Sequence, residues 1–353
     1  MPQLFDITNW HLHPWFNTGG TRDKKYVQDP NTGSYYYFKK SFKRGTRDYF
    51  FEFWSEIIAS ELGKLLGFNV LQYDIAIFKN EMGCISESMI EENETLVEGG
   101  RYLQAYDVRF DPTVKEGRRF HSFQLIEETL KFFQLDHIEG IIEIIIFDAI
   151  LGNGDRHQEN WAFITKPTFL STGIGEMGDA VKSGEFDRIP SWIKSIYRFL
   201  FDFNKREIKP AAKVAELKLQ KTKSLAPIFD NGSSLGRELD TAKIRIMLND
   251  ENAIISYVKK GLSEIHWHNQ KLNHHDLVRE LATSAHSEIV LNTIRRVADS
   301  FNRSSFEDLI LSIDHLVPMG MENFKLPLDR KRLILKLVTL RIEQLKSLAN
   351  GGV

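Results

Sequence analysis

The sequence lacks the features that mark secreted, membrane-spanning or nucleic-acid-binding proteins. Its single cysteine, Cys84, excludes an intrachain disulfide and fits a reducing compartment. The N-terminus has no basic region followed by an apolar core, so a signal peptide is not expected. The longest apolar run, Ile141 to Leu151, contains Glu143 and Asp148 and is too short to span a bilayer. There is no Lys/Arg block, and the net charge is −2, which gives no basic surface for nucleic acid.

The composition is that of an ordinary globular protein. The chain has 353 residues, of which 42% are hydrophobic and 27% are charged. This length allows two lobes, each with a core of its own. We therefore expect a cytoplasmic protein that contacts neither a membrane nor nucleic acid directly.

One polar stretch, which begins Leu151-Gly-Asn-Gly-Asp-Arg-His and ends Gln-Glu-Asn160, stands between two apolar segments. A glycine-bearing turn between buried segments places its side chains at a cleft. Asp155 and Asn160 have the spacing of a kinase catalytic loop, in which the Asp is the base and the Asn binds Mg²⁺. This spacing also arises by chance in many proteins, so the flanking sequence must supply the remaining parts of a phosphoryl-transfer site.

A small, basic stretch at residues 17–25 comes first among those parts. Its glycines allow backbone N–H groups to turn toward an anion, so Gly19, Gly20 and Thr21 are candidates to cradle phosphates; the alternative is a plain surface turn. Aromatic and β-branched runs on either side of a turn then predict a hairpin over residues 26–40. Lys39 and Lys40 end its second strand on opposite faces, so one of them could point into the cleft under the glycine turn.

The period changes to that of a helix over residues 47–67, with Gly67 as its C-terminal cap. Glu56 lies at the edge of the apolar stripe, where it either reaches a strand lysine or remains a solvated surface charge. Two further strands are predicted over residues 70–78 and 84–90. The segment from Glu87 to Met89 would then be a hinge whose backbone bonds an adenine edge.

Beyond the hinge, residues 91–121 are predicted to be a connecting loop, followed by helices over 122–133 and 141–151. After a long irregular interval, an apolar strand delivers Asp230 to a glycine turn, where a kinase has its second Mg²⁺-binding Asp. A helix over residues 190–203 is interpreted as a cover of the second lobe or, alternatively, as a partner-binding or substrate-binding flap. Helices follow from Asp240, with a capping box at Ser304.

Together these parts predict an α+β fold of two lobes. The N-lobe covers residues 1–90 and binds nucleotide; the C-lobe covers residues 91–353, with an insertion at about 165–224. In this interpretation Lys39 orients the α- and β-phosphates of ATP and Glu56 holds Lys39. Asp155 takes or positions the substrate proton, and His157 supports the loop or bonds a phosphate. The Mg²⁺ ligands are Asn160 and Asp230.

The motifs Gly-Asn-Gly-Asp-Arg-His-x-x-Asn-Trp and Ala-Pro-Ile-Phe-Asp-Asn-Gly-Ser-Ser-Leu-Gly resemble those of the bacterial HipA-like serine/threonine kinases. The Gly-Asp-Arg-His-x-x-Asn core is also similar to that of phosphatidylinositol kinases. The HipA-like resemblance implies a bilobal kinase that uses ATP and Mg²⁺ to modify Ser or Thr of a protein. It also implies a toxin role, a DNA-binding antitoxin as partner, and autophosphorylation in the glycine-rich loop at Thr18 or Thr21.

Three other functions stay open at this point. The shared core motif also fits a lipid or small-molecule kinase, although no basic amphipathic helix for membrane docking is present. A pseudokinase that only binds nucleotide would have no need to retain all of Lys39, Asp155, Asn160 and Asp230. A structural or nucleic-acid-binding protein has no basic footprint in its favour. Histidines at 266–275 have no recognised zinc-ligand spacing and are interpreted as surface or packing residues.

Overall fold

The computed structural model describes most of the chain, and this part divides into two compact units. Unit 1 consists of residues 1–89, 97–163 and 225–353, and unit 2 consists of residues 90–96 and 164–224. The described residues are 1–14, 24–41, 43–44, 47–91, 94–111, 113–114, 117, 120–169, 201–202, 207–208 and 218–351.

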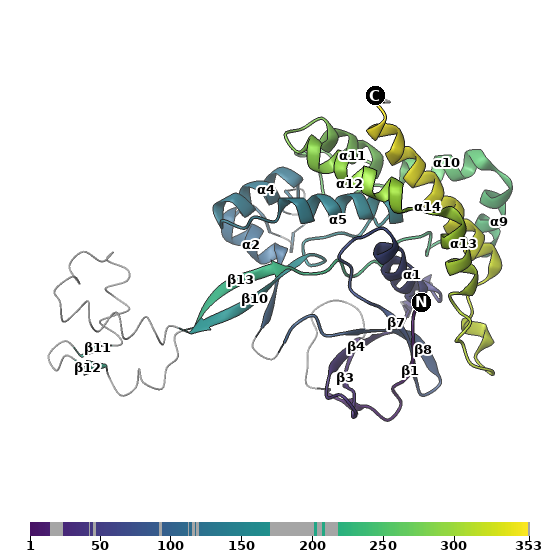
Figure 1. Ribbon diagram of the computed structural model, residues 1–353, viewed down its shortest axis with the longest axis horizontal. Helices are drawn as coiled ribbons and strands as arrows, with labels where there is room; N and C mark the ends of the chain where they lie inside the picture. Colours follow the sequence, from purple (N-terminus) through teal and green to yellow (C-terminus); the bar gives the residue numbers. More distant parts are fainter. Residues whose placement is uncertain are drawn as a thin grey trace. The chain divides into compact units, whose positions relative to one another are not determined.

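A six-stranded sheet in the order β1-β7-β8-β4-β3-β2 forms the N-terminal part of unit 1 (Figure 1). Strands β1 and β7 run parallel, and the other neighbours are antiparallel. The predicted hairpin is confirmed as β3 and β4, whose register places Lys24 opposite Lys39. The strands are β1 (Leu4–Asp6), β2 (His11–Leu12), β3 (Lys24–Gln28), β4 (Tyr35–Lys39), β7 (Asp74–Phe78) and β8 (Glu81–Glu87), and a separate pair is formed by β5 (Lys43–Arg44) and β6 (Arg47–Asp48).

Helix α1 (Glu52–Leu65) packs against β8 on one face of this sheet. Its Phe53 belongs to the same buried cluster as Cys84 of β8, whereas Ile85 faces a second cluster with Phe38 on the other side. This alternation is the period of a strand with two buried faces. Leu66 is the C-terminal cap of α1, and Gly67, which was predicted as the cap, follows it with a φ of 75° that favours glycine.

The helical part of unit 1 is built around α5 (Ile138–Leu151), whose residues from Ile144 to Leu151 are all buried. Helix α5 packs against α11, α12 and α14, so its apolar surface on all sides is explained by neighbours on several sides. The other helices are α2 (Gly99–Tyr106), α4 (Phe123–Phe132), α9 (Thr241–Asn249), α10 (Glu251–Lys260), α11 (His274–Ala282), α12 (Ser287–Ser300), α13 (Arg303–Ser312), η2 (Glu322–Phe324) and α14 (Leu328–Ala349).

Two local predictions are wrong. Residues 91–121 are not a plain loop, because they include β9 (Thr95–Glu98) and α2. Helix α2 begins with two glycines, and a Cβ added at Gly99 would lie 2.2 Å from the ring of Trp161. The cap of α13 is Asn302, whose side chain accepts a hydrogen bond from Ser305 N, rather than Ser304.

Unit 2 consists mainly of extended chain among its described residues. Strands β10 (Ala162–Phe169) and β13 (Lys218–Leu225) form a three-stranded sheet with β9, in the order β13-β10-β9. A second pair, β11 (Phe201–Asp202) and β12 (Glu207–Ile208), is antiparallel. The helix predicted over residues 190–203 is therefore wrong at its last described positions, and the remainder of it lies outside the described residues.

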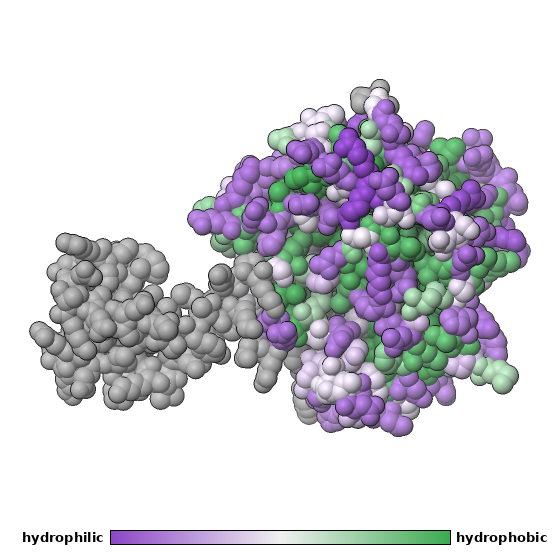
Figure 2. Space-filling model, viewed as in Figure 1, coloured by the Kyte–Doolittle hydropathy of each residue, from purple (hydrophilic) through white to green (hydrophobic). Residues whose placement is uncertain are grey.

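The surface of unit 1 is mixed in polarity. In Figure 2, hydrophilic residues cover much of the face shown, and hydrophobic residues are visible between them. None of the described helices combines the length and the apolar character that crossing a bilayer requires.

Candidate active site

The side chain of Lys39 lies at the centre of the candidate site. Lys39 ends β4 and is 5% exposed. Its Nζ atom donates to Glu56 Oε1, and it lies 2.6 Å from Asp230 Oδ1. Lys39 therefore contacts two residues that come from distant parts of the sequence, as predicted for Glu56. A lysine held between two carboxylates keeps a fixed position.

Glu56 is wholly buried on α1, so the interpretation of it as a surface charge is wrong. One of its oxygens accepts from Lys39, and the other accepts from the backbone N–H of Asn231 at 2.7 Å. A buried carboxylate needs partners for both oxygens, and these two contacts supply them. Glu56 thus fixes the strand lysine and the Asp230 segment relative to α1.

The polar loop begins where α5 ends. Gly152 caps the helix with a φ of 67°, a left-handed conformation that favours glycine. Asn153 then donates to Asp148 Oδ1 at 3.1 Å and accepts from the backbone N–H of Asp155 at 3.2 Å. Asn160 donates its side-chain N–H to the carbonyl of Asp155 at 2.6 Å. These bonds fold the loop back on itself and bring the two ends of the Asp-x4-Asn motif together.

Arg156 ties this loop to the segment that carries Asp230, which lies beyond the end of β13 rather than on a strand as predicted. It is 1% exposed, and it pairs with both oxygens of Asp148, at 2.8 and 2.9 Å. The same guanidinium donates to Asn160 O at 2.8 Å and to Phe229 O at 2.5 Å. It also donates to Asn231 Oδ1 at 2.7 Å. The planar donor fork of arginine suits such a set of fixed acceptors.

The Asp155 carboxylate is half-buried, and its Oδ2 accepts from the hydroxyl of Ser233 at 3.0 Å. It therefore has an orienting partner and keeps access to solvent. His157 is also half-buried, and its Nδ1 accepts from the backbone N–H of Glu159 at 3.3 Å. This contact fits a role for His157 in supporting the loop, which was one of the two roles predicted.

The structure describes only some of the residues that were predicted to contact the adenine base and the phosphates. Glu87 ends β8 with an exposed side chain, and Met89 lies two residues beyond it. Ser88 N donates to Tyr35 O, so the alternation of an antiparallel ladder turns the backbone groups of Glu87 away from β4. The hinge role stays a prediction. Gly19, Gly20, Thr21 and the proposed modification site Thr18 lie outside the described residues.

Four polar residues of this site were not predicted from the sequence: Asp148, Arg156, Asn231 and Ser233. Arg156 lies inside the recognised loop motif, yet its partners Asp148 and Asn231 cannot be identified from local spacing. Asn231 stands beside Asp230, and its amide oxygen is the acceptor that Arg156 uses. Ser233 was part of a glycine-bearing turn, and nothing in the pattern pointed to its contact with Asp155.

The predicted Mg²⁺ ligands are both oxygen donors. The amide nitrogen of Asn160 is engaged by Asp155 O, which leaves the amide oxygen of Asn160 as its atom for a metal. Asp230 supplies a carboxylate and has a left-handed backbone, with φ 55°. Among the described residues no group of three His, Cys, Asp or Glu could hold a metal by itself. Two oxygen ligands completed by substrate phosphates match the usual mode of Mg²⁺ binding.

Comparison with known proteins gives a likeness in structure rather than in sequence. No family model matches the chain, and no curated protein matches it. The crystal structure of the Helicobacter pylori proinflammatory kinase CtkA aligns with a TM-score of 0.66 over 99% of this chain and 98% of that one, at 16% identity. HipA from Shewanella oneidensis, in a complex with HipB and operator DNA, aligns with a TM-score of 0.44 over 95% of this chain and 67% of that one, at 10% identity. The alignment with CtkA confirms the predicted α+β bilobal fold, so this chain has the fold of a kinase.

Proposed function

We propose that this protein is a kinase that uses ATP and Mg²⁺ and transfers the γ-phosphate to a Ser or Thr hydroxyl of a protein. One observation carries the proposal: Lys39 contacts both Glu56 and Asp230, while Arg156 ties the Asp155 loop to the same segment. Phosphoryl transfer depends on fixed charges and alignment more than on covalent help from the protein. A site with this rigidity and these charges suits that reaction.

Each residue has a defined task in this proposal. Lys39 neutralises charge on the α- and β-phosphates, and Glu56 keeps its amino group in place. Asn160 and Asp230 would hold Mg²⁺, which when bound neutralises charge on the phosphates. Asp155 accepts the proton of the attacking hydroxyl, and Ser233 orients the Asp155 carboxylate by its hydrogen bond.

The bonds and charges balance in this scheme. The hydroxyl oxygen of the substrate forms a bond to the γ-phosphorus as the bond from that phosphorus to the β,γ-bridging oxygen breaks. The electron pair of the broken bond leaves with ADP, and the hydroxyl proton passes to Asp155. Water in place of the substrate hydroxyl would give ATP hydrolysis by the same steps.

The test compares two variants of the same loop. Purified protein is incubated with radiolabelled ATP, Mg²⁺ and a bacterial protein extract, and label in protein is measured. Asp155→Asn keeps the shape of the side chain and removes its basicity, so labelling is expected to fall by about 10²–10⁴-fold. Glu159→Gln is the matched control, because Glu159 is exposed on the same loop. Equal labelling by the wild type and Asp155→Asn would refute the assignment.

The same assay separates the rival functions. Label in phosphoinositide vesicles, with none in protein, would identify a lipid kinase. A pseudokinase would bind ATP and Mg²⁺ in a thermal-shift experiment but give no Asp155-dependent label. The toxin role, the antitoxin partner and phosphorylation at Thr18 or Thr21 stay predictions from the resemblance. Growth arrest on expression of the wild type, and normal growth with Asp155→Asn, would support the toxin role.

A further inference from the structure

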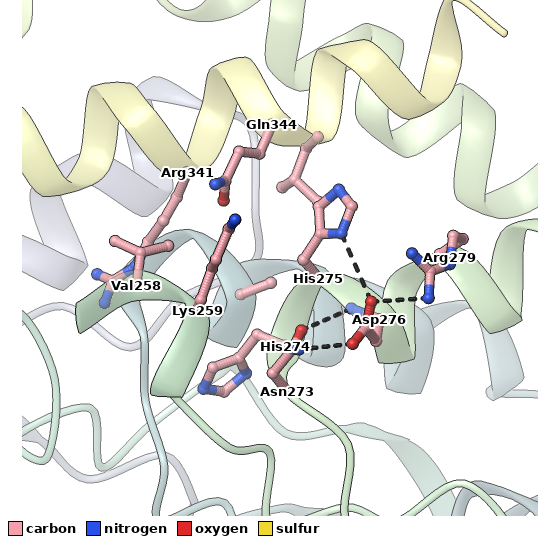
Figure 3. A pocket seen from close by; sticks show the side chains of 11 residues that line it. Val258, Lys259, Asn273, His274, His275, Asp276, Arg279, Arg341 and Gln344 are labelled. Carbon is pink, nitrogen blue, oxygen red and sulfur yellow. Dashed lines mark hydrogen bonds and ion pairs between the residues drawn. The ribbon is translucent and has the colours of Figure 1, made fainter. Parts of the chain in front are cut away.

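A second polar pocket lies in the helical part of unit 1, between α10, α11 and α14 (Figure 3). Its volume is about 400 Å³, and it reaches Ala149 of α5. A pocket of this size is at the lower end of the range of small-molecule sites, which is about 300–1,000 Å³. None of its lining residues belongs to the candidate active site, so the proposed kinase chemistry does not account for it.

The charge of the pocket lining is predominantly positive. Lys259, Arg279 and Arg341 line it, together with a single carboxylate, Asp276. Arg279 neutralises that carboxylate, because its guanidinium lies 2.8 Å from Asp276 Oδ1. Asn273 also donates to Asp276, at 2.5 Å. The charges of Lys259 and Arg341 are therefore left for an anion in the pocket.

Arg341 is the main reason to expect an anion. It is 6% exposed and donates to the carbonyl of Leu151 at 2.7 Å, and no carboxylate among the described residues forms an ion pair with it. Burial lowers the pKa of Arg341, and the nearby Tyr257 and Glu238 offset this only in part. A buried cation without an anionic partner is costly, and a bound anion would remove that cost.

His274 provides an independent indication of a ligand. It is 7% exposed and lines the pocket, and its Nε2 atom has no hydrogen-bond partner among the described residues. Burial lowers the pKa of His274 to about 3, so the ring is neutral at pH 7 and can donate one N–H. His274 is also the first residue of α11, whose N-terminus adds positive potential.

We propose that this pocket binds the phosphate group of a small phosphorylated ligand, which Arg341 and His274 contact directly and Lys259 faces from the rim. Figure 3 shows the long side chain of Lys259 extending toward Gln344 of α14, while Arg341 enters from α14 and His274 from the start of α11. Donors on three separate elements suit a tetrahedral phosphate better than a planar carboxylate.

The experiment measures binding rather than activity. Inorganic phosphate, glucose 6-phosphate and acetate are each titrated into the full-length protein by calorimetry at constant ionic strength. Phosphate or glucose 6-phosphate is expected to bind, and acetate is expected to bind at least ten times more weakly. Tighter binding of glucose 6-phosphate than of phosphate would identify a phosphorylated metabolite as the ligand class, whereas equal affinity would identify the free ion.

Two variants locate the site. Lys259→Ala removes an exposed charge of the lining and is expected to weaken binding at least fivefold. Lys260→Ala is its matched control, because Lys260 is exposed on the same helical turn but does not line the pocket; its affinity should stay within twofold of the wild type. His274→Phe keeps the ring and removes the donor, so binding should fall at least tenfold. Arg341 is not replaced, because its bond to Leu151 supports the fold.

Three results would overturn the proposal. The first is that neither phosphate nor glucose 6-phosphate binds to the wild type. The second is equal loss of affinity in Lys259→Ala and Lys260→Ala, which would indicate general charge attraction. The third is acetate binding as tight as phosphate binding. Because Lys259 is exposed, the first pair of variants decides the matter even if His274→Phe does not fold.

Discussion

Replacement of Arg156 by Met should destabilise the protein strongly, although the two side chains are similar in length. In the wild type the guanidinium engages both oxygens of Asp148, which is 3% exposed. Without it, the carboxylate stays buried and keeps the Asn153 amide as a donor. Removal of one partner from a buried pair costs about 3–5 kcal/mol. The carbonyls of Asn160 and Phe229 would also lose a donor, at about 1 kcal/mol each.

A double variant, Asp148→Leu with Arg156→Met, separates these two contributions. Burial raises the pKa of Asp148 despite the adjacent guanidinium, so desolvation of this carboxylate is costly in the folded protein. Replacement of both charges by apolar groups should therefore recover at least about 2 kcal/mol of the stability that the single variant loses. The recovery should be incomplete, because the acceptors on Asn160, Phe229 and Asn231 still lack their donor.

Urea unfolding followed by tryptophan fluorescence measures both effects. With a slope of about 3 kcal/mol per molar urea, a loss of about 5–7 kcal/mol lowers the midpoint by about 1.7–2.3 M. Phosphate transfer should be lost in both variants, because the hydrogen bonds by which Arg156 ties the Asp155 loop to the Asp230 segment are gone. The reasoning fails if the midpoint of Arg156→Met lies within about 0.3 M of the wild type, or if the double variant is no more stable than the single one.

Three further changes test other parts of the structure. Burial lowers the pKa of His121 from 6.5 to about 3, so its contribution to stability is present above pH 6.5 and is lost as the pH falls from 6.5 toward 3. Urea titrations at pH 7 and at pH 4.5 measure this effect. Over this range the unfolding free energy of His121→Gln should fall by about 2–3 kcal/mol less than that of the wild type. An equal fall in both proteins would contradict the prediction. Ser233→Ala should lower kcat by about 3–30-fold in the phosphate-transfer assay without a shift in Tm, because the Asp155 carboxylate loses its orienting donor; an unchanged kcat would remove Ser233 from the site. Gly152→Ala should lower the unfolding free energy by at least about 1–2 kcal/mol, because φ is 67° and the new Cβ would meet the guanidinium of Arg341. Urea unfolding measures this change, and an unchanged unfolding free energy would contradict the cap geometry.

The long elements of the fold could be predicted from the sequence because their signals are local. The apolar stripe of α1 and the apolar run of α5 each specify a helix by period or by length. The short elements could not be predicted in this way. Strand β1 has three residues and depends on its pairing with β7, from Leu4 opposite Ile75 to Asp6 opposite Ile77. Helix α2 opens with Gly99 and Gly100, whose small size serves packing against Trp161 and Gln158 rather than helix formation.

In the candidate site, too, residues with a local sequence signal could be predicted and residues that depend on distant contacts could not. Lys39, Asp155 and Asp230 could be predicted because each belongs to a motif with a recognisable order along the chain. The contact of Arg156 with Asn231 joins residues 75 positions apart, so no local pattern announces it. Glu56 could be proposed from its place on a helix edge, but its complete burial depends on partners on β4 and on the Asp230 segment.

Asn231 explains why this chain departs from the better-known protein kinases, which have an apolar residue after the metal-binding Asp. Its backbone N–H donates to Glu56, and its side-chain oxygen accepts from Arg156. An apolar side chain could preserve the first contact, since any residue other than proline has the N–H, but it could not make the second. The buried guanidinium of Arg156 would then lack one acceptor in an interior where water cannot replace it. Asn231 and Arg156 thus act together. Their hydrogen bonds join α1, the Asp155 loop and the Asp230 segment, so that the charged groups on all three keep fixed positions.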